Sequence, residues 1–523
     1  MGDPFLDAPA QDSLRLRDRD RLAGPDELHR VVGHGPDRAN PDKTLVGVGR
    51  PGASDEKRFT HRYRRTFMTT HEYDVAVVGA GTAGCYAAAT VARAGLDVVV
   101  VERKSESEAG HIACGDALKG ADAFPDVIPK DQIAPAFTNT DVDHGRFEIP
   151  SEDVVLEIPV PGELAVIDRW EYGRLIIDGA ERAGATFHYD TVVQDVVQDE
   201  SGRVTGLRAR RQGDPVEYDA EVVVDAAGSL SILQDHADLA DATFDTNVRY
   251  SQFCSAYREI VRVEDPVDWV DALVFKPTER AAGYLWYFPR TATEINVGLG
   301  FQMNEEPMHL VDDLRDDLRG RPEFQNATVE DKLGAALPTR RPYDSAVAPG
   351  FVAVGDAAGH VNPTTGGGIA GAAYAGSYAA QQAVEAIGDG DVSEAALWAY
   401  NERVMDHFGA RYAALDVYNI FTTAADIDDL MGLLAAMPTE KLSEALYSGS
   451  ANVGLLLKLR TAIKSLGHWR TLYDLYQTKT LADRLLDHYE SYPSGPSDFE
   501  AWRSARDGIM DDIYAATGAD PKY

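Results

Sequence analysis

Cysteine and long apolar runs are the two features that this sequence most clearly lacks. The chain of 523 residues has only three cysteines, Cys85, Cys114 and Cys254, whose spacing matches neither a metal site nor a disulfide framework. We therefore expect no metal and a reducing compartment. No signal peptide and no run of 18 apolar residues is present, which predicts a cytoplasmic protein without a transmembrane segment.

Lysine is scarce as well, and acidic residues are in large excess. The chain has 12 lysines and 38 arginines against 85 acidic residues, and its formal net charge is −35. An acidic, arginine-rich surface stays hydrated and keeps molecules apart when salt screens charge, so the composition favours a halophilic protein from a high-salt cell. Such a surface repels phosphate, which argues against nucleic acid as a partner.

The first 67 residues differ from the rest of the chain. They lack hydrophobic periodicity, are rich in Gly, Pro, Asp and Arg, and carry 13 basic and 11 acidic residues. Such composition is typical of disordered segments. We expect residues 1–67 to be a disordered extension, consistent with a true start at Met68. A functional basic tail is the alternative.

A complete β-α-β pattern follows in residues 73–104. The apolar strand 75–78 leads into GAGTAG at 79–84, then an alanine-rich helix, then the strand 97–101, which ends at Glu102. A GxGxxG motif alone is weak evidence, but between two apolar strands and followed by an acid it indicates a dinucleotide site.

Each glycine of this motif has an expected role. Gly79 permits the tight turn, Gly81 lets the backbone approach a pyrophosphate, and Gly84 allows close packing of helix on strand. The diphosphate would lie at the helix N-terminus, and Glu102 would accept the ribose hydroxyls, which disfavours a 2′-phosphate. A tight glycine turn without a ligand is the alternative.

A second constellation, FVAVGDAAGHVNPTTGGGIAG at 351–371, separates a flavin from a nicotinamide. It predicts a strand, the acid Asp356 at its end, and a glycine run at Gly366, Gly367 and Gly368 that opens a helix extending to about Ala380. The acid suits a polyol hydroxyl, and backbone amides at a helix start can stabilise negative charge on a reduced flavin. The alternative is that Asp356 only caps the next helix.

Together with segments 168–184 and 222–228, these pieces resemble flavoproteins with the para-hydroxybenzoate hydroxylase type of FAD fold. More narrowly, the chain resembles the archaeal geranylgeranyl reductase family from about residue 72 to 385. The matching motifs are GAGTAG (79–84), CGDAL (114–118), YLWYFP (284–289), VGLG (297–300) and GDAAGHVNPTTGGGI (355–369).

The resemblance implies a set of FAD contacts. Carried over by position, they fall on Ala83, Glu102, Cys114, Gly115, Ala117, Arg169, Val193, Asp356, Gly368 and Ile369. The residue His360 lies within the second constellation and is given no role.

Residues 245–301 contain several strand-like runs and no helical periodicity, which predicts an inserted antiparallel sheet. In the run GYLWYFP, alternation places Tyr284, Trp286 and Phe288 on one face, and Pro289 ends the strand. The resemblance implies that this face covers the flavin and lines an apolar tunnel for a prenylated lipid substrate. Spacing alone leaves the alternative that these aromatics are ordinary core.

The resemblance further implies an FAD-dependent reductase that saturates geranylgeranyl chains in archaeal membrane ether-lipid precursors. Cys114 is the candidate catalytic group beside the ring, and an ordinary small residue in a crowded loop is the alternative. The electron donor would be ferredoxin or NAD(P)H. No second β-α-β pattern with this motif between its strands marks a dedicated nicotinamide domain.

Two other functions stay open. An FAD-dependent monooxygenase or halogenase on the same fold would need a nicotinamide route to the flavin and a small pocket, and the aromatic run argues against that. A non-catalytic prenyl-binding protein would have lost the flavin, and the presence of Glu102, Arg169 and Asp356 argues against that.

One segment predicts contact with a membrane surface. No acid occurs between Glu444 and Asp474, and as a helix residues 455–470 would place leucines on one face and bases largely on the other. Cationic amphipathic helices bind anionic membranes, so we expect peripheral association with the inner face of the cell membrane. A helix packed on its own domain is the alternative.

The expected fold class is α/β. We expect a Rossmann-like FAD-binding domain of the GR2 type at 68–230 and 340–385, an antiparallel-sheet substrate domain at 231–339, and a helical C-terminal region at 386–523.

Overall fold

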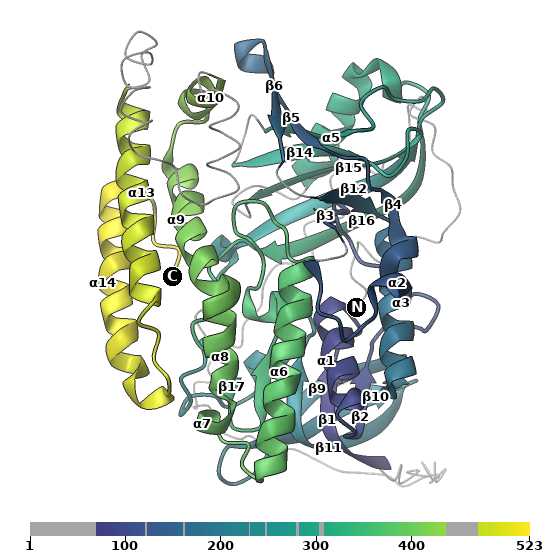
Figure 1. The fold of residues 1–523 in the computed structure, drawn as a ribbon, viewed down its shortest axis with the longest axis vertical. Coiled ribbons are helices and arrows are strands. Elements are labelled where there is room, and N and C mark those ends of the chain that lie inside the picture. The colour runs from purple at the N-terminus through teal and green to yellow at the C-terminus, as the bar shows by residue number, and fades with distance from the viewer. Residues whose placement is uncertain are drawn as a thin grey trace, which may run out of the picture. The chain divides into compact units, whose positions relative to one another are not determined.

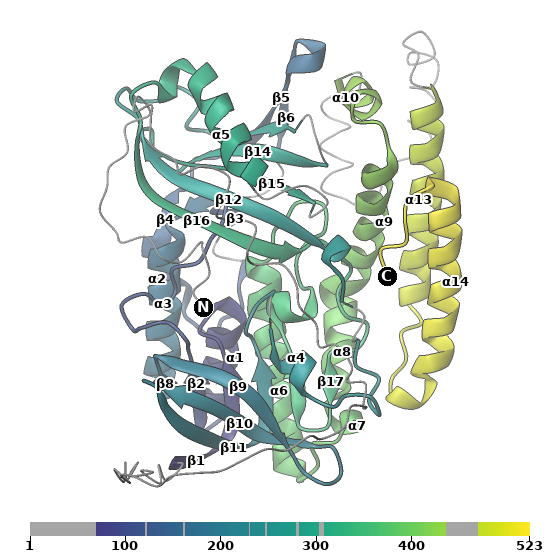
Figure 2. The same ribbon diagram turned by 180° about the vertical axis from the view of Figure 1, so that it is seen from behind.

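Two large sheets carry the motifs identified in the sequence (Figures 1 and 2). The computed structural model describes residues 69–120, 123–160, 163–229, 231–245, 248–278, 282–302, 308–435 and 469–523. The predicted extension 1–67 lies outside the described residues. So does the predicted membrane segment 455–470, except for its last two residues.

The first sheet has eight strands in the order β17-β18-β11-β1-β2-β8, with β10 joined to β11 and β9 to β10. Their bounds are β1 (Thr69–Val78), β2 (Val98–Val101), β8 (Thr186–His188), β9 (Thr191–Gln198), β10 (Val204–Arg211), β11 (Asp214–Asp225), β17 (Val347–Ala348) and β18 (Phe351–Ala353). β1 runs parallel to β2 and β11, and β18 runs parallel to β11. Parallel strands are buried on both faces, which explains their unbroken valine runs, and their carboxyl ends meet at one edge.

Three long helices pack beside this sheet. They are α1 (Thr82–Arg93), α3 (Arg169–Ala183) and α6 (Ile369–Asp389), and α1 lies between the other two (Figure 1). Asp168 caps α3, because its carboxylate accepts the amides of Trp170 and Glu171 at 3.0 Å each. The helix α6 extends nine residues beyond the expected end at Ala380 and stops at Gly390, whose φ is +70°.

The second sheet has seven strands in the order β16-β12-β15-β14-β13-β5-β6. Their bounds are β5 (His144–Ile149), β6 (Val154–Pro159), β12 (Phe253–Arg262), β13 (Ala272–Pro277), β14 (Gly283–Pro289), β15 (Glu294–Gln302) and β16 (Thr328–Pro338). The helix α5 (Met308–Gly320) covers one face through Leu310, Leu314 and Leu318. The other face carries three aromatic side chains of β14.

This sheet differs from expectation in two respects. β5 and β6 come from a segment that we assigned to the FAD-binding part of the chain, and β5 pairs with β13 in parallel, so the sheet is mixed. Strand alternation reports which residues share a face but not which distant strand is the neighbour, so the sequence did not reveal this pairing.

A third, small sheet has three strands. Its strands are β3 (Ala117–Lys119), β7 (Leu164–Ile167) and β4 (Phe137–Asn139), and β7 pairs antiparallel with both neighbours. Ala117 and Val166 pack against the aromatic face of the second sheet. The short helices α2 (Lys130–Ile133) and α4 (Leu233–His236) complete this part of the fold.

From residue 394 onward, the described part of the chain is mainly helical. Its helices are α7 (Glu394–Leu397), α8 (Ala399–Val404), α9 (Ala410–Ala424), α10 (Ile427–Ala435), α13 (Trp469–Tyr489) and α14 (Phe499–Thr517), with a π-helical turn at Met405–Gly409. α13 packs between α9 and α14 (Figure 2). Among the described residues, no helix is both long enough and apolar enough to cross a bilayer.

A buried ionic network ties these helices to the loop after β16. The carboxylate of Asp344 contacts the guanidinium groups of Arg341, at 3.3 Å, and Arg506, and it accepts the hydroxyl of Tyr489. These partners hold the pKa of Asp344 at about 2 against the opposing effect of burial. Removing Asp344 would deprive both buried guanidinium groups of this carboxylate, which is costly.

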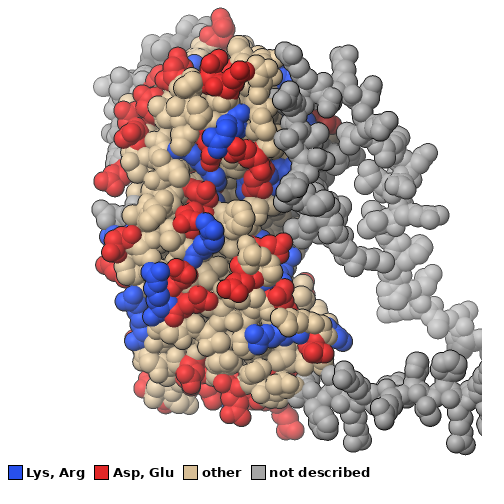
Figure 3. All heavy atoms as spheres, turned by 90° about the vertical axis from the view of Figure 1, so that its right-hand side faces the viewer, with Lys and Arg blue, Asp and Glu red and all other residues tan. Residues whose placement is uncertain are grey.

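The surface mixes charges of both signs. On the face shown in Figure 3, Lys and Arg side chains are interspersed with Asp and Glu rather than gathered into one patch. Exposed pairs such as Arg182 with Asp178, at 2.9 Å, contribute little to stability, and less at high salt. The surface therefore serves hydration and repulsion more than stability.

Candidate functional site

The glycine loop between β1 and α1 requires glycine at two positions, Gly79 and Gly84. Gly79 has φ +101°, and a Cβ there would lie 2.5 Å from the carbonyl oxygen of Ala226. A Cβ on Gly84 would overlap the carbonyl oxygen of Gly79. The helix begins after Gly81 with no side-chain cap, so its first amides stay available to an anion.

Glu102 lies at the carboxyl end of β2, beside this loop. Its Oε2 accepts the amide of Ala80 at 2.9 Å and its Oε1 accepts the amide of Lys104 at 2.8 Å, so the carboxylate is held in place. Each oxygen keeps lone pairs for further hydroxyl donors. Val193 lies on β9, which begins next to Glu102, and its side chain is buried in the core of the sheet.

Asp356 lies at the carboxyl end of β18, in the short turn Gly355–Ala358. Its Oδ2 accepts the hydroxyl of Ser229 at 3.2 Å, and burial raises the pKa of its carboxyl group. It does not cap α6, whose N-cap is Gly368. A buried carboxyl group with so few partners suits hydrogen bonds to a bound polyol.

The first and second motifs meet at Ala83. A Cβ on Gly355 would lie 3.0 Å from the Cβ of Ala83, and a Cβ on Gly376 would overlap the carbonyl oxygen of Ala83. α1 and α6 therefore cross in close contact, which brings Asp356 next to the glycine loop.

His360 is a site residue to which the sequence gave no role. It is 1% exposed, and its Nδ1 accepts the amide of Gly355 at 3.1 Å. Burial lowers the pKa of the imidazole to about 3, so the ring is neutral and can accept this bond. Gly355 has φ +63°, so His360 stabilises the turn that presents Asp356.

Arg169 supplies positive charge at the same place. It is 4% exposed, its Nη2 donates to Thr82 Oγ1 at 3.2 Å, and its Nη1 is buried without a hydrogen-bond partner among the described residues. An unpartnered buried guanidinium nitrogen, uncapped amides at α1 and a buried Asp356 together fit a ligand with phosphates and a polyol. That is the chemistry of the FAD expected from the sequence.

The second glycine run opens α6. Gly366 has φ +70°, and the helix begins at Ile369 after the N-cap Gly368, again without a side-chain cap. Gly367 lies between them, and its carbonyl accepts the amide of Asn362 at 3.0 Å. The Tyr284 hydroxyl donates to the carbonyl oxygen of Thr365 at 2.7 Å, so the aromatic strand β14 is bonded to this loop.

Tyr284, Trp286 and Phe288 of β14 share one face, as alternation predicted, whereas Tyr287 lies on the face covered by α5. The ring centroids of Tyr284 and Trp286 lie 6.1 Å apart, and those of Trp286 and Phe288 lie 6.3 Å apart. A Cβ on Gly298 would overlap the indole of Trp286, so this glycine makes room for the indole. Pro289 is the last residue of the strand.

Two further phenylalanines extend this face. Phe275 on β13 lies 5.2 Å from Phe288, and Phe147 on β5 stacks on Phe275 at 4.8 Å between centroids. The sequence did not point to Phe147, because Phe147 and its strand partner Phe275 lie 128 residues apart in the chain. The local run of apolar residues around Phe275 was the only signal available.

The loop from Cys114 to Ala117 lies on the aromatic face. A Cβ on Gly115 would lie 3.3 Å from Phe288 and 3.5 Å from Trp286. The side chain of Asn296 connects the two layers: its Oδ1 accepts the indole Nε1–H of Trp286 at 2.9 Å, and its Nδ2 donates to the carbonyl oxygen of Cys114 at 2.8 Å.

Burial, followed by the charge of Asp116, raises the pKa of the Cys114 thiol to about 11. The thiol is therefore protonated at neutral pH and is not a thiolate nucleophile. The other cysteines lie elsewhere: Cys85 is buried in α1, and Cys254 lies on β12, where burial raises its thiol pKa to about 12.

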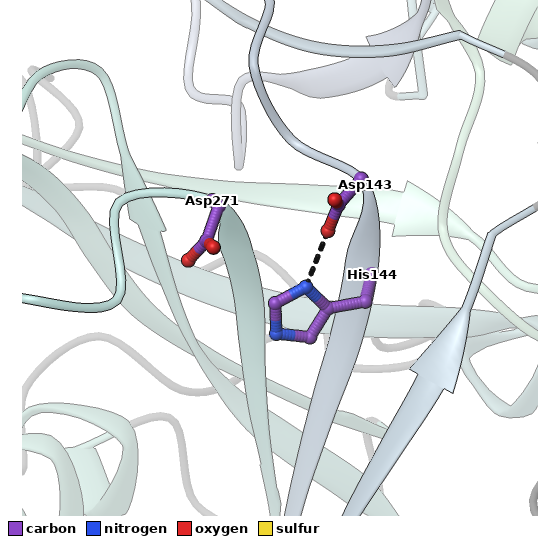
Figure 4. A group of neighbouring side chains, drawn as sticks. All are labelled: Asp143, His144 and Asp271. Carbon is purple, nitrogen blue, oxygen red and sulfur yellow. Dashed lines mark hydrogen bonds and ion pairs between the residues drawn. The ribbon is translucent and has the colours of Figure 1, made fainter.

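Asp143, His144 and Asp271 form a cluster at the start of β5 and β13 (Figure 4). His144 Nδ1 lies 2.6 Å from Asp143 and its Nε2 lies 2.9 Å from Glu157, so both ring nitrogens already face carboxylates. We therefore assign the cluster no metal.

Comparison with known proteins places this geometry in a family. Residues 72–408 match the family described as "FAD binding domain". The digeranylgeranylglycerophospholipid reductase of Sulfolobus acidocaldarius is 28% identical over 85% of this chain and 98% of its own length. The enzyme of the same name from Methanothrix thermoacetophila is 30% identical over 73% of this chain and 95% of its own length.

Solved structures agree. A geranylgeranyl bacteriochlorophyll reductase-like protein from Thermoplasma acidophilum superposes with a TM-score of 0.63 and 25% identity, covering 78% of this chain and all of its own. A flavin-dependent brominase has a TM-score of 0.53 at 17% identity over 84% of this chain and all of its own, which shows a shared fold alone.

Proposed function

Because this chain belongs to the FAD binding domain family and, within it, to the geranylgeranyl reductase family, we propose that it is an FAD-dependent reductase of archaeal lipids. It saturates the double bonds of geranylgeranyl chains in membrane ether-lipid precursors. One observation supports this most directly. The aromatic face of β14 lies against the Cys114 loop and is bonded through Tyr284 to the glycine run of α6, so prenyl-binding and flavin-binding elements adjoin.

The protein itself would bind the lipid, exclude water from it and supply a proton. When bound and reduced, FAD supplies a hydride for one alkene carbon. Trp286 and Phe288 are buried and exclude water from the face on which an isoprenoid would lie. Each buried CH₂ of the chain contributes about 0.8 kcal/mol, so one prenyl unit contributes several.

Cys114 is our candidate for a catalytic group beside the reacting atoms. An isolated alkene has no carbonyl to polarise, so its second carbon needs a positioned acid. The Cys114 thiol keeps its proton at neutral pH because burial raises its pKa. It therefore retains a proton in the loop whose next residue, Gly115, packs against Trp286 and Phe288.

A redox donor must supply the electrons. The sequence has one β-α-β pattern with a GxGxxG motif between its strands, at 73–104, and the FAD site uses it, so a dedicated NAD(P)H domain is not expected. Ferredoxin and NAD(P)H both remain candidates. Anaerobic mixing of the oxidised holoenzyme with each donor, followed by bleaching of the visible flavin bands, distinguishes them.

Access to a lipid substrate would be through a membrane surface. The cationic segment 455–470 carries no acid in a chain of net charge −35, and its apolar face would contribute most of the binding when salt screens charge. This part of the proposal rests on sequence, since the segment lies almost entirely outside the described residues.

One anaerobic experiment tests the function. The full chain, purified in high salt, is reduced with dithionite and given a geranylgeranyl-bearing ether phospholipid, and the substrate mass is followed. A flavin spectrum with mass increasing in steps of two hydrogens is the expected result. A flavoprotein that leaves the lipid unchanged but consumes oxygen with NADPH and a phenol would instead establish the monooxygenase or halogenase function. A colourless protein that binds prenyl chains would establish a carrier.

A further inference from the structure

The loop from His111 to Asp116 crosses the second sheet and is anchored there at three points. At its start, His111 Nε2 lies 2.8 Å from Asp331 Oδ2 on β16. In its middle, the carbonyl oxygen of Cys114 accepts Asn296 of β15 at 2.8 Å. At its end, Asp116 pairs with Arg290, which directly follows β14. A loop anchored by side chains from three strands has little freedom to shift relative to the sheet.

The last anchor is the most deeply buried. Asp116 is fully buried and Arg290 is 5% exposed. The carboxylate Oδ2 accepts Nε at 2.8 Å and Nη2 at 2.7 Å, while Oδ1 has no hydrogen-bond partner among the described residues. Removing two charges from water costs free energy that offsets much of their mutual attraction. A contribution to protein stability alone is therefore a weak explanation for this pair.

The backbone at Asp116 is also unusual. Its φ is +70°, in the left-handed region that residues other than glycine rarely adopt. This conformation turns the amide of Asp116 back towards the cysteine, so that it donates to Cys114 Sγ at 3.2 Å. The same backbone conformation directs the Asp116 side chain into the protein, where its ion pair with Arg290 holds it. Strain of this kind persists where the surroundings fix it, and it gathers at functional sites.

Arg290 reaches a third element as well. Its Nη1 lies 3.4 Å from Asp168, the N-cap of α3, and 3.3 Å from Glu294 on β15. The residue after Asp168 is Arg169, whose guanidinium contacts Thr82 in the first turn of α1. One guanidinium therefore joins the end of the aromatic strand to the cysteine loop and to the helix that carries Arg169.

We infer that Arg290, acting through Asp116, is a positioning residue that fixes the Cys114 thiol in a loop held against the aromatic face of β14. Arg290 touches neither the aromatic face nor the thiol in the contacts described here, and its effect is transmitted by the backbone of Asp116. The buried carboxylate also contributes, after burial itself, to the raised pKa of the thiol. The inference concerns the geometry of the loop and rests on the proposed reductase function only for its catalytic consequence.

Two conservative substitutions test it in the full-length holoenzyme. Arg290→Lys keeps the charge but cannot make the paired bonds to Asp116, and Asp116→Asn keeps the shape and tolerates a left-handed φ. Arg262→Lys is the matched control, because Arg262 lies on β12 of the same sheet, is exposed and pairs with Glu330 and Glu294.

The first readout does not need activity. The rate of alkylation of Cys114 by iodoacetamide is measured by peptide mass spectrometry, with Cys254 in the same molecule as the internal reference. We expect alkylation of Cys114 to become about tenfold faster or more in Arg290→Lys and in Asp116→Asn, with Cys254 unchanged. The double variant should be no faster than the faster single variant, because both changes break one linkage.

The second readout uses lipid reduction. If the thiol is displaced, kcat should fall by about 10- to 100-fold while KM for the lipid changes little, since a small misplacement costs rate more than binding. Unchanged Cys114 alkylation in both variants would overturn the inference, as would equal acceleration at Cys254, which would indicate general loosening. A wild-type holoenzyme inactive on the lipid would contradict the proposed function but leave the alkylation result interpretable.

Discussion

The indole Nε1–H of Trp286 donates to the Asn296 side-chain oxygen at 2.9 Å, and this bond fixes which way the amide of Asn296 points. Its Nδ2 then has to face the carbonyl oxygen of Cys114. One amide therefore sets the spacing between the aromatic face and the cysteine loop.

Replacing this amide should separate the two layers. In Asn296→Leu, the indole N–H and the Cys114 carbonyl lose their partner in a buried place, which costs about 1–3 kcal/mol of the free energy of unfolding. Denaturant unfolding at high salt measures the loss. Asn326→Leu is the control, because Asn326 bonds Glu264 at the surface, and it should change stability little. Equal stability of the two variants would contradict the role of Asn296.

The hydroxyl of Tyr284 should matter for flavin binding rather than for packing. Tyr284→Phe removes only the bond to the Thr365 carbonyl and leaves the aromatic face intact. We expect FAD to bind about fivefold more weakly, equivalent to about 1 kcal/mol, because the glycine run before α6 loses one restraint. Flavin fluorescence on titration of the apoprotein gives Kd. Tyr250→Phe, at a residue 80% exposed, should leave Kd unchanged.

A methyl group at Gly298 should displace the indole of Trp286. The added Cβ would overlap the six-membered ring, and a well-packed layer can accommodate it only by moving the indole or the strand, at a cost of about 1–3 kcal/mol. Thermal unfolding and tryptophan fluorescence report both effects. In contrast, Gly388→Ala on α6 meets no atom within 4 Å and should stabilise the helix by up to about 1 kcal/mol. A Gly298→Ala protein as stable as the wild type would contradict this prediction, because the aromatic layer would then accommodate the methyl group without cost.

His360 should make the protein sensitive to acid. Its folded pKa is lowered to about 3, so between about pH 6.5 and pH 3 the unfolded chain binds a proton that the folded chain does not. The free energy of unfolding therefore rises with pH across this window, and the contribution of the neutral His360 is lost as the pH falls. The asparagine of His360→Asn can still accept the Gly355 amide but does not titrate.

The difference in unfolding free energy between wild type and His360→Asn should therefore shrink, or reverse in favour of the variant, as the pH falls from 7 to 4. Release of FAD, followed by its fluorescence, should show the same dependence, because His360 supports the turn that carries Asp356. A difference that stays constant with pH would rule out this titration.

The membrane segment can be tested by charge reversal. Changing Lys458, Arg460 and Lys464 together to Glu should release the protein from anionic liposomes, since each base near the surface contributes about 1 kcal/mol. Flotation with vesicles of anionic and of neutral lipid measures the binding. A triple change of the exposed Arg174, Arg182 and Arg484 to Glu alters the net charge equally and should leave flotation unchanged. Equal release by both triple variants would assign the effect to net charge alone.

Local patterns in the sequence were enough to predict the FAD-binding fold. The spacing of Gly79, Gly81 and Gly84 between apolar strands predicted the turn found between β1 and α1, because backbone geometry there is dictated by residues adjacent in the chain. Alternation alone likewise placed Tyr284, Trp286 and Phe288 on one face of β14.

Such local patterns could not predict contacts between segments that are distant in the sequence. Nothing near Arg290 indicates that its partner is Asp116, which lies 174 residues earlier, and nothing near Phe147 indicates that its strand pairs with β13. Asn296 carried a weak signal, since a polar residue interrupts an otherwise apolar strand. His360 carried none, because a buried neutral imidazole and an exposed one look alike in sequence.

The order of strands in the first sheet constrains how the protein is made. β1 and β2 pair early in the chain, but β18, at Phe351–Ala353, pairs with β11 and precedes the turn that carries Asp356. Closing the sheet therefore requires contacts between segments separated by more than a hundred residues, which form slowly during folding. A growing chain therefore lacks part of the cradle for FAD until α6, which follows Gly368, has been synthesised, so the cofactor site can be completed only late in synthesis.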